Sequence, residues 1–527
     1  MSRTFAVVGF SVFVLLLATP VPATVFTVNT TSDGVNPGAC SPPIGTCTLR
    51  EAVIEANAHP GDDEIDVPAG TYALTVPGAN EDDAQTGDLD LTSLGDDKIT
   101  IAGAGSGVTI IDGQQAEDPD RVFDNFIDAT LTGLTIRNGH ATAGLAQGGA
   151  IYNGGTLTLT DVVITGSSAA SGGGILSNGP VTMTNCSVSG NTAVTRGGGI
   201  ESNDDLVGEG VTISGNTADR GGGISNDFTL TFTNVTVSGN TASTSGGGLR
   251  TSAVATLTNV TFSGNGAPTG GAIDNLGDVT LAGVIVANST GSPNCALALG
   301  STLLSSGYNL DSGSSCGLSA VGDLSNTDPQ LDTLRDNGGP TLTHALLAGS
   351  PAIDAGSPDC PPPAKDQRGI DRPADGNLDG TATCDIGAVE MSTQLVGSTT
   401  TTTLFGSTTT TLPGCTHEPT FPSILCRLDV LASNVRAGVP PGAFQTALLG
   451  MLTTARSRTM EADQALAAQQ TRRGKSKAAK AIGTLKKFKK RLRSRKAKTV
   501  PDGVRTDLAA DADAIRTDLV TLRRSGR

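Results

Sequence analysis

The chain has 527 residues, 37% hydrophobic content, no Trp and a formal net charge of -16. This length and apolar content exclude a chain too short or too polar to bury a core, and they leave room for several domains. The charge is divided unevenly, because residues 415–527 hold 23 Lys and Arg against 9 Asp and Glu, whereas residues 1–414 hold 12 against 42. An acidic body therefore precedes a basic tail.

Residues 1–23 have the pattern of a signal peptide. Arg3 precedes an apolar run over residues 5–18, and Val21-Pro22-Ala23 forms a cleavage site. The run is short for a membrane span, and no later stretch is long and apolar enough to be one. We expect an exported protein, at the cell surface or secreted, with no transmembrane span once the signal is removed.

Eight of the nine cysteines lie near a second cysteine in the sequence, which in an exported protein predicts disulfides. The predicted pairs are Cys40–Cys47, Cys295–Cys316, Cys360–Cys384 and Cys415–Cys426. The ninth, Cys186, stands where the neighbouring repeats have Val, which predicts a buried apolar thiol.

Residues 24–60 predict an N-terminal cap. A strand over residues 25–29 leads into a Cys-bounded loop, and residues 47–57 have apolar side chains at helical spacing. A short helix here would cover the open end of the first coil. The stretches 29–33 (Asn-Thr-Thr-Ser-Asp) and 47–52 (Cys-Thr-Leu-Arg-Glu-Ala) resemble the CSLREA domain of exported bacterial β-helix proteins, with Thr48 in place of Ser. The resemblance implies structural roles for Arg50 and Glu51.

Irregular coils follow up to about residue 136, and their loops carry acidic clusters at residues 81–83 and 88–90. The clusters predict solvated surface, with calcium binding as the alternative.

Residues 148–289 contain a short glycine-rich motif that occurs six times. Gly-Gly-Gly/Ala followed by Ile or Leu ends at residues 151, 175, 200, 224, 249 and 273, a spacing of 24 or 25 residues. A fixed period of this size indicates a solenoid. The phrase Ser-Gly-Asn-Thr-Ala, which begins at residues 189, 214 and 238, keeps step with it. A disordered Gly/Ser/Thr-rich tract is the alternative, but disorder gives no reason for two phrases to stay in phase.

Short runs of alternating apolar residues within each repeat predict strands. Aligning the repeats gives three apolar columns: Leu157, Val181, Leu206, Leu230 and Ala255; Val162, Cys186, Val211, Val235 and Val260; Ile164, Val188, Ile213, Val237 and Phe262. The alternation slips by one at Asp161, Asn185, Gly210, Asn234 and Asn259, where corners must bend the chain. Corner Asn tolerates left-handed dihedrals and can bond to the coils above and below. We predict a parallel β-helix over residues 61–299.

Residues 300–392 are similar to the choice-of-anchor Q domain. The resemblance rests on motifs such as Asn337-Gly338-Gly339-Pro340, Gly349-Ser350-Pro351-Ala352-Ile353-Asp354 and Cys384-Asp385-Ile386-Gly387. It implies a surface or secreted role and assigns no catalytic residue.

Asp375, Asn377 and Asp379 match the opening of a calcium loop, in which oxygen ligands converge around a glycine turn. Ile386 stands at the twelfth place, where the loop needs a carboxylate, although Asp385 is adjacent. A polar turn is the competing interpretation, and calcium is the one cofactor that the sequence suggests.

Residues 393–414 form a Thr-rich linker, and residues 415–527 predict a basic helical domain of three or four helices. The basic stretch 475–498 predicts a charged outer face, with contact to anionic polymers or lipid headgroups as the alternative. Export argues against a specific nucleic-acid role.

The outward position after each glycine phrase is a candidate for catalytic side chains, and it holds Tyr152, Leu176, Glu201, Ser225, Arg250 and Asp274. Glu201 and Asp274 lie three coils apart, roughly 14 Å, which is too far for a glycosidase pair. Arg250 beside Asp274 predicts a surface ion pair, and Glu201 with Asp204 or Asp205 stays open. No catalytic residue is assigned.

Together these features predict an all-β right-handed parallel β-helix, a pectin-lyase-like solenoid, followed by a small C-terminal α-helical bundle. Its handedness follows from the resemblance and from the rule for parallel crossovers. We expect a non-catalytic, adhesin-like rod that binds extracellular glycans or partner surfaces. The alternative is a polysaccharide lyase or glycoside hydrolase.

Overall fold

The computed structural model divides into two compact units, Met1–Ser398 and Thr399–Arg527. It describes residues 23–391 except 42–44, 79–80, 94–96, 115–119, 142–145, 361–362 and 378. It also describes residues 471–492, 494, 500, 502–525 and single helical positions between 424 and 462. The predicted signal peptide up to residue 22, the Thr-rich linker and the Cys415–Cys426 pair lie outside the described residues.

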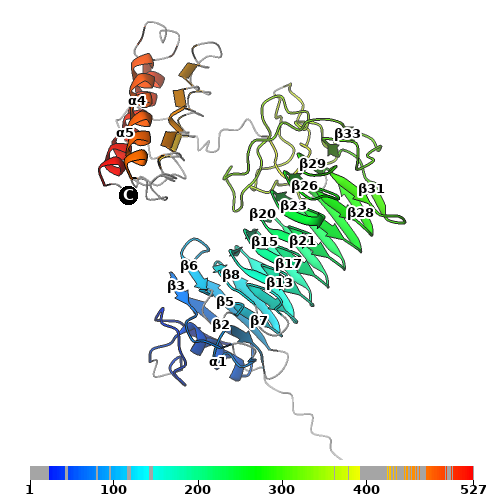
Figure 1. The fold of residues 1–527 in the computed structure, drawn as a ribbon, viewed down its shortest axis with the longest axis vertical. Helices are drawn as coiled ribbons and strands as arrows, with labels where there is room; N and C mark the ends of the chain where they lie inside the picture. The colour runs from blue at the N-terminus through cyan, green and yellow to red at the C-terminus, as the bar shows by residue number, and fades with distance from the viewer. Residues whose placement is uncertain are drawn as a thin grey trace, which may run out of the picture. The chain divides into compact units, whose positions relative to one another are not determined.

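The first unit is a stack of parallel coils whose strands form three sheets (Figure 1). Sheet A has 20 strands: β1 (Thr24–Thr27), β2 (Asp63–Val67), β3 (Gly70–Ala73), β5 (Lys98–Gly103), β6 (Thr109–Asp112), β8 (Asp128–Thr132), β9 (Thr135–Arg137), β11 (Thr156–Thr160), β12 (Val163–Thr165), β15 (Val181–Thr184), β16 (Ser187–Ser189), β19 (Leu206–Glu209), β20 (Thr212–Ser214), β23 (Leu230–Ser238), β26 (Val254–Ser263), β28 (Asp278–Ala282), β29 (Ile285–Ala287), β31 (Thr302–Ser305), β32 (Leu310–Asp311) and β33 (Leu324–Ser325). Sheet B has nine: β4 (Leu89–Leu91), β7 (Phe123–Asn125), β10 (Ile151–Asn153), β14 (Ile175–Ser177), β18 (Ile200–Ser202), β22 (Ile224–Asn226), β25 (Leu249–Thr251), β27 (Ile273–Asn275) and β30 (Cys295–Leu297). Sheet C has four: β13 (Ser168–Ser171), β17 (Thr192–Arg196), β21 (Thr217–Arg220) and β24 (Thr241–Ser245).

The strand register confirms the predicted parallel β-helix. Leu157 pairs with Val181, which pairs with Leu206, and the column continues through Leu230 and Ala255. All fifteen residues of the three predicted columns are buried in one continuous core. The coils therefore share a single apolar interior, as stacking repeats requires.

The corners lie where the alternation slips. Asp161, Asn185, Gly210, Asn234 and Asn259 all have positive φ, between 52° and 68°. Only Gly, Asn and Asp reach this left-handed region readily, which explains the residue types at the corner.

A second corner holds a ladder of buried asparagines: Asn191, Asn216, Asn240 and Asn265. The Nδ2 of Asn216 donates to Oδ1 of Asn240 at 2.9 Å, and Asn240 repeats the bond to Asn265 at 3.0 Å. The Oδ1 atoms of Asn216, Asn240 and Asn265 also accept from the backbone N–H of the preceding ladder residue, as in Asn216 to Asn240 at 3.0 Å. The ladder thus ties four successive coils to one another inside the core.

Helix α1 (Leu49–Ala58) covers the N-terminal end of the stack, shown in blue in Figure 1. The Thr48 side chain caps it by accepting from the Glu51 N–H. The buried Arg50 guanidinium pairs with Asp33 at 2.8 Å and donates to four backbone carbonyls of the loop 84–88. Glu51 accepts from the N–H groups of Asn36 and Gly38. Both charged residues hold the cap together.

Three of the predicted disulfides are present: Cys40–Cys47, Cys295–Cys316 and Cys360–Cys384. Cys186 is a free, buried thiol in the Val column, as predicted, and burial raises its pKa to about 12.

Residues after β33 fold back over the outer face of sheet A, as the yellow-green segment in Figure 1 shows. The Gln367 amide donates to the Val211 carbonyl at 3.2 Å, and the Ala388 N–H donates to the Thr261 hydroxyl at 3.0 Å. Ile285 packs into a second apolar cluster with Leu310, Leu346, Ala352 and Ile386. The segment therefore covers strands that would otherwise face solvent.

His344 connects this segment to the solenoid. Its Nε2 lies 2.8 Å from the Ser238 hydroxyl, and its Nδ1 lies 2.7 Å from the Asp332 carbonyl. The carbonyl can only accept, so Nδ1 carries the proton and the neutral ring accepts from Ser238. Burial lowers the pKa of His344, and the bond to the Asp332 carbonyl and the Asp332 carboxylate oppose the shift.

We expect acid to weaken this connection. Since the pKa of His344 is lower in the folded protein, the unfolded chain binds the proton first below about pH 6.5. The stabilisation is complete above that pH and is lost as the pH falls through the lowered value. Thermal unfolding of wild type and His344→Gln at pH 7.5 and 5.0 measures it, and wild type should lose more stability than the variant. An equal loss in both would contradict this assignment.

The second unit contains α4 (Thr471–Leu492) and α5 (Asp502–Ser525), which pack together. Their shared core holds the predicted stripe residues Leu485, Phe488, Leu508, Ile515 and Leu519. Helical positions before them, including Leu428 and Leu452, join the same core. The predicted helices of the C-terminal region are confirmed where the structure describes them.

Candidate functional site

The middle residues of successive sheet B strands lie in register on one outer face. We call this set the polar row; it comprises Asp90, Asp124, Tyr152, Leu176, Glu201, Ser225, Arg250 and Asp274. Three-residue strands bounded by glycine corners present one such side chain per coil. Most of the row is nonetheless buried.

The centre of the row is a network of alternating charges. Arg196, at the end of β17, places Nη1 3.0 Å from Oδ2 of Asp227 at the opposite corner. Arg250 lies between two carboxylates, with Nη1 3.7 Å from Asp227 and Nε 3.9 Å from Asp274. The predicted ion pair between Arg250 and Asp274 is therefore present, at the long end of ion-pair distances.

Glu201 is a buried member of the row with one carboxylate oxygen that has no hydrogen-bond partner. The Glu201 residue is 7% exposed, and the oxygen without a partner is its buried Oε2 atom. Burial raises the pKa of Glu201, whereas the Ser171 hydroxyl and Arg196 lower it and Asp227 raises it further. A carboxyl group of this kind can act as a general acid.

The carboxylate that raises the pKa of Glu201 is Asp227, which lies beyond the end of the neighbouring strand β22. The Asp227 carboxylate is engaged by Arg196 and accepts from the Ser252 hydroxyl at 2.6 Å. A glycosidase needs an acid and a second carboxylate available to water or to the sugar. Here the second carboxylate is held in ion pairs with Arg196 and Arg250.

A hollow of about 520 Å³ lies beside the row, at the corner between sheets B and A. Phe126 in its lining is 45% exposed, and its ring centroid lies 6.0 Å from that of Tyr152. The Tyr152 hydroxyl accepts from Asn178 at 3.0 Å, and Arg121 lies over the ring at 5.5 Å from the centroid. An aromatic surface flanked by amide and carboxylate groups is suited to bind a polar ligand with apolar faces.

The hollow also has acidic walls. Asp97, Asp128 and Asp204 contribute to its lining, and Asp128 is paired with Lys98 at 2.5 Å. These groups offer hydrogen-bond acceptors to hydroxyl donors.

The acidic loop before β4 differs from expectation. Residues 88–90 were predicted to be solvated surface, but Asp88 is 2% exposed and Asp90 is 0% exposed. Burial raises the pKa of Asp90 to about 7 and that of Asp124 to about 6. The prediction was wrong because β4 is the first strand of sheet B, and its neighbours cover it.

Asp375, Asn377 and Asp379 form a sequence of side-chain-capped turns. Asn377 Oδ1 accepts from the Asp379 N–H at 2.8 Å, and Asp379 Oδ1 accepts from the Thr381 N–H at 2.8 Å. Asp375 Oδ2 accepts from the Gly380 N–H at 3.0 Å. Asp385 bonds to the Asp354 N–H and so lies in a neighbouring network. Calcium at this loop stays a prediction.

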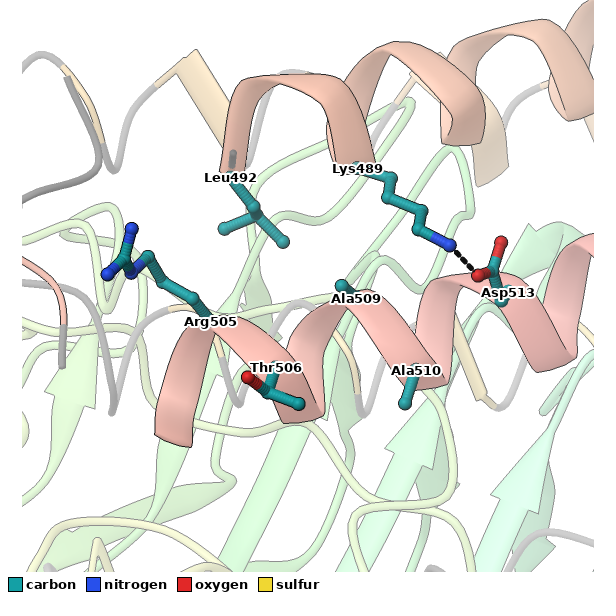
Figure 2. Close-up of a pocket in the computed structure, with 7 residues that line it drawn as sticks. All are labelled: Lys489, Leu492, Arg505, Thr506, Ala509, Ala510 and Asp513. Atoms are coloured by element: carbon teal, nitrogen blue, oxygen red, sulfur yellow. Dashed lines mark hydrogen bonds and ion pairs between the residues drawn. The ribbon is translucent and has the colours of Figure 1, made fainter. Parts of the chain in front are cut away.

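The helical unit has a cavity of about 580 Å³ between α4 and α5 (Figure 2). Lys489 and Leu492 line it from α4, and Arg505 and Ala509 line it from α5. Lys489 forms an ion pair with Asp513 across the two helices. No helix among the described residues is long and apolar enough to cross a membrane.

These features define the protein as a parallel β-solenoid of about eight turns with a packed pair of C-terminal helices. No protein-family model, curated protein or solved structure matches the chain.

Sequence reasoning identified the row positions from Tyr152 to Asp274, but it missed Asp90 and Asp124 in the row. It also missed three residues beside the row, Arg196, Asp227 and Phe126. All three lie at corners flanking sheet B strands, one or more coils from their partners. The constant period was a signal that could have found them, because it also aligns the corner residues.

Proposed function

We propose that this protein is an exported, non-catalytic, adhesin-like surface component whose solenoid binds extracellular glycans. The single observation that carries the proposal is the hollow lined by Phe126, whose ring lies next to that of Tyr152. The hollow joins the exposed Phe126 ring to carboxylate and amide groups, the combination that stacks against sugar rings and bonds to their hydroxyls.

Export is supported by the signal-like N-terminus and by three disulfides, which form and persist in oxidising compartments. The proposal includes the finer assignments made from resemblance, a CSLREA-type cap at residues 24–60 and a choice-of-anchor Q-like region at residues 300–392. It also includes contact between the basic helical domain and anionic surfaces. Helix α4 supports that contact, because it carries many Lys and Arg side chains and no acidic one.

Glycan binding can be tested with the full chain on a panel of acidic and neutral polysaccharides. We expect Phe126→Ala to weaken the binding of a retained glycan about tenfold, the effect of roughly 1.4 kcal/mol. Phe228→Ala is the matched control, because Phe228 is 48% exposed at another corner of the same solenoid. Retention of no glycan, or equal losses in both variants, would contradict the proposal.

A glycoside hydrolase is the second candidate, and the raised pKa of Glu201 is the observation that favours it. Hydrolysis would release reducing ends from a bound glycan, and Glu201→Gln would abolish that release while binding persists. Such a result would replace the non-catalytic proposal. Retention of glycan without new reducing or unsaturated ends supports it.

A further inference from the structure

Three carboxylates meet at the N-terminal end of the polar row. Asp82, Asp90 and Asp124 each offer an oxygen atom, and the three atoms lie within 4.8 Å of one another. Asp90 and Asp124 are register partners on adjacent strands β4 and β7, so both project from the same face of sheet B. Asp82 reaches them from the loop that precedes β4.

The local charge is strongly unbalanced. Asp88 and Asp120 lie beside Asp124, and the Arg121 guanidinium interacts with these three carboxylates. Arg121 donates to both oxygens of Asp124 at 2.8 and 2.9 Å, and it lies 3.5 Å from Asp120 and 3.7 Å from Asp88. One guanidinium cannot offset this many acidic groups in a partly desolvated site.

An independent observation comes from the buried oxygen atoms. The Asp90 residue is 0% exposed, and its Oδ2 accepts from the Ala84 N–H at 2.7 Å. Its Oδ1 is buried and has no hydrogen-bond partner, and the same is true of Oδ1 of Asp88. A buried anionic oxygen without a partner is costly, and a cation satisfies it.

The loop that supplies Asp82 and Asp88 is held in place by Arg50 of the N-terminal cap. Arg50 donates to the carbonyls of Ala84, Gly87 and Asp88 at 3.0, 2.7 and 2.8 Å. Ala84 has a φ of 58°, a strained conformation for a residue with a side chain. The cap thus fixes the loop in a shape that gathers the carboxylates instead of letting them separate.

We propose that Asp82, Asp90 and Asp124 bind one calcium ion, with water completing its coordination. Calcium takes six to eight oxygen ligands at about 2.4 Å, so two ligands on opposite sides of the ion lie about 4.8 Å apart. Magnesium demands a tighter and more regular arrangement. Asp124 can serve the ion and Arg121 together, because a carboxylate has about four lone-pair sites. The site is independent of the proposed glycan binding.

The test is isothermal titration of the EDTA-dialysed full chain with calcium chloride, and separately with magnesium chloride. We expect wild type to bind calcium with a dissociation constant in the range of about 10⁻⁴–10⁻³ M, and magnesium more weakly. Asp90→Asn and Asp82→Asn should each weaken that binding at least tenfold. Asp82 is exposed, so its variant reports on the site even if Asp90→Asn fails to fold.

Two control variants locate the ion. Asp205→Asn changes an exposed aspartate elsewhere on the solenoid, and Asp375→Asn changes the other loop that could take calcium. Both should retain the binding that Asp90→Asn loses. Absence of calcium heat in wild type, or loss in Asp375→Asn with retention in Asp90→Asn and Asp82→Asn, would overturn the proposal.

Discussion

Replacing Asn240 with Ala is expected to lower the free energy of unfolding by about 3–5 kcal/mol. The side chain donates to the Ile213 carbonyl at 3.0 Å and to Oδ1 of Asn265 at 3.0 Å. It also accepts from the backbone and side-chain N–H groups of Asn216 at 3.0 and 2.9 Å. Its partners are fully buried, so Ala leaves several polar groups without a replacement partner.

Denaturant unfolding followed by circular dichroism measures this effect. Thr241→Ala is the control, because Thr241 is adjacent in sequence and exposed, and such a change alters stability by about 0.5 kcal/mol or less. If both variants unfold within about 1 kcal/mol of each other, the asparagine ladder does not stabilise the stack as described.

Phe232→Ala should have an effect of similar size, a loss of about 3–5 kcal/mol. Phe232 is 0% exposed and pairs in register with Gly208 on the preceding coil. A Cβ on Gly208 would lie 2.8 Å from the Phe232 ring, so the ring fills the space that glycine leaves. Removing the ring opens a cavity that the two adjacent coils cannot close.

The matched control is Phe228→Ala, which removes the same ring from a side chain that is 48% exposed four residues earlier. We expect it to change stability by about 0.5 kcal/mol or less. Comparable losses from the two substitutions, again in denaturant unfolding, would show that burial in the solenoid interior does not distinguish these residues.

The regular coils could be predicted because their residues repeat with a nearly constant period. Val211 and Val235 fall in one column by alignment alone, and the slip in alternation at Asn185 and Asn234 marks the positions with positive φ. Each feature depends on contacts between neighbouring coils, about 24 residues apart. In this part of the chain, residues one period apart in the sequence are therefore also neighbours in the structure.

The segment after the last regular coil could not be placed in this way. Gln367 bonds to the Val211 carbonyl across 156 residues, and Ala388 bonds to Thr261 across 127. No periodicity connects those residues, so the position of the segment on sheet A could not be predicted from local pattern. Strand pairing in the solenoid also continues through β33, beyond the predicted end at residue 299.

The candidate sites were predicted in part for the same physical reason. Glu201, Arg250 and Asp274 follow the glycine phrase, so their shared face could be predicted. Asp90 lies in an irregular early coil that lacks the repeated glycine motif. Its position in sheet B therefore follows only from its strand pairing with Asp124 in the structure. Asp227 pairs with Arg196 from the opposite corner of sheet B, so this contact depends on the width of the strands between them.

The most direct test of the stacked-coil architecture is a distance between two spin labels, at Thr158 and Thr280. These residues occupy one register row and are separated by five strand steps through Thr182, Val207, Thr231 and Thr256. At about 4.8 Å per step, their Cα atoms should lie about 24 Å apart, although 122 residues separate them in sequence. A narrow distribution near that distance is the predicted result, whereas a broad distribution at much longer distances would contradict the solenoid.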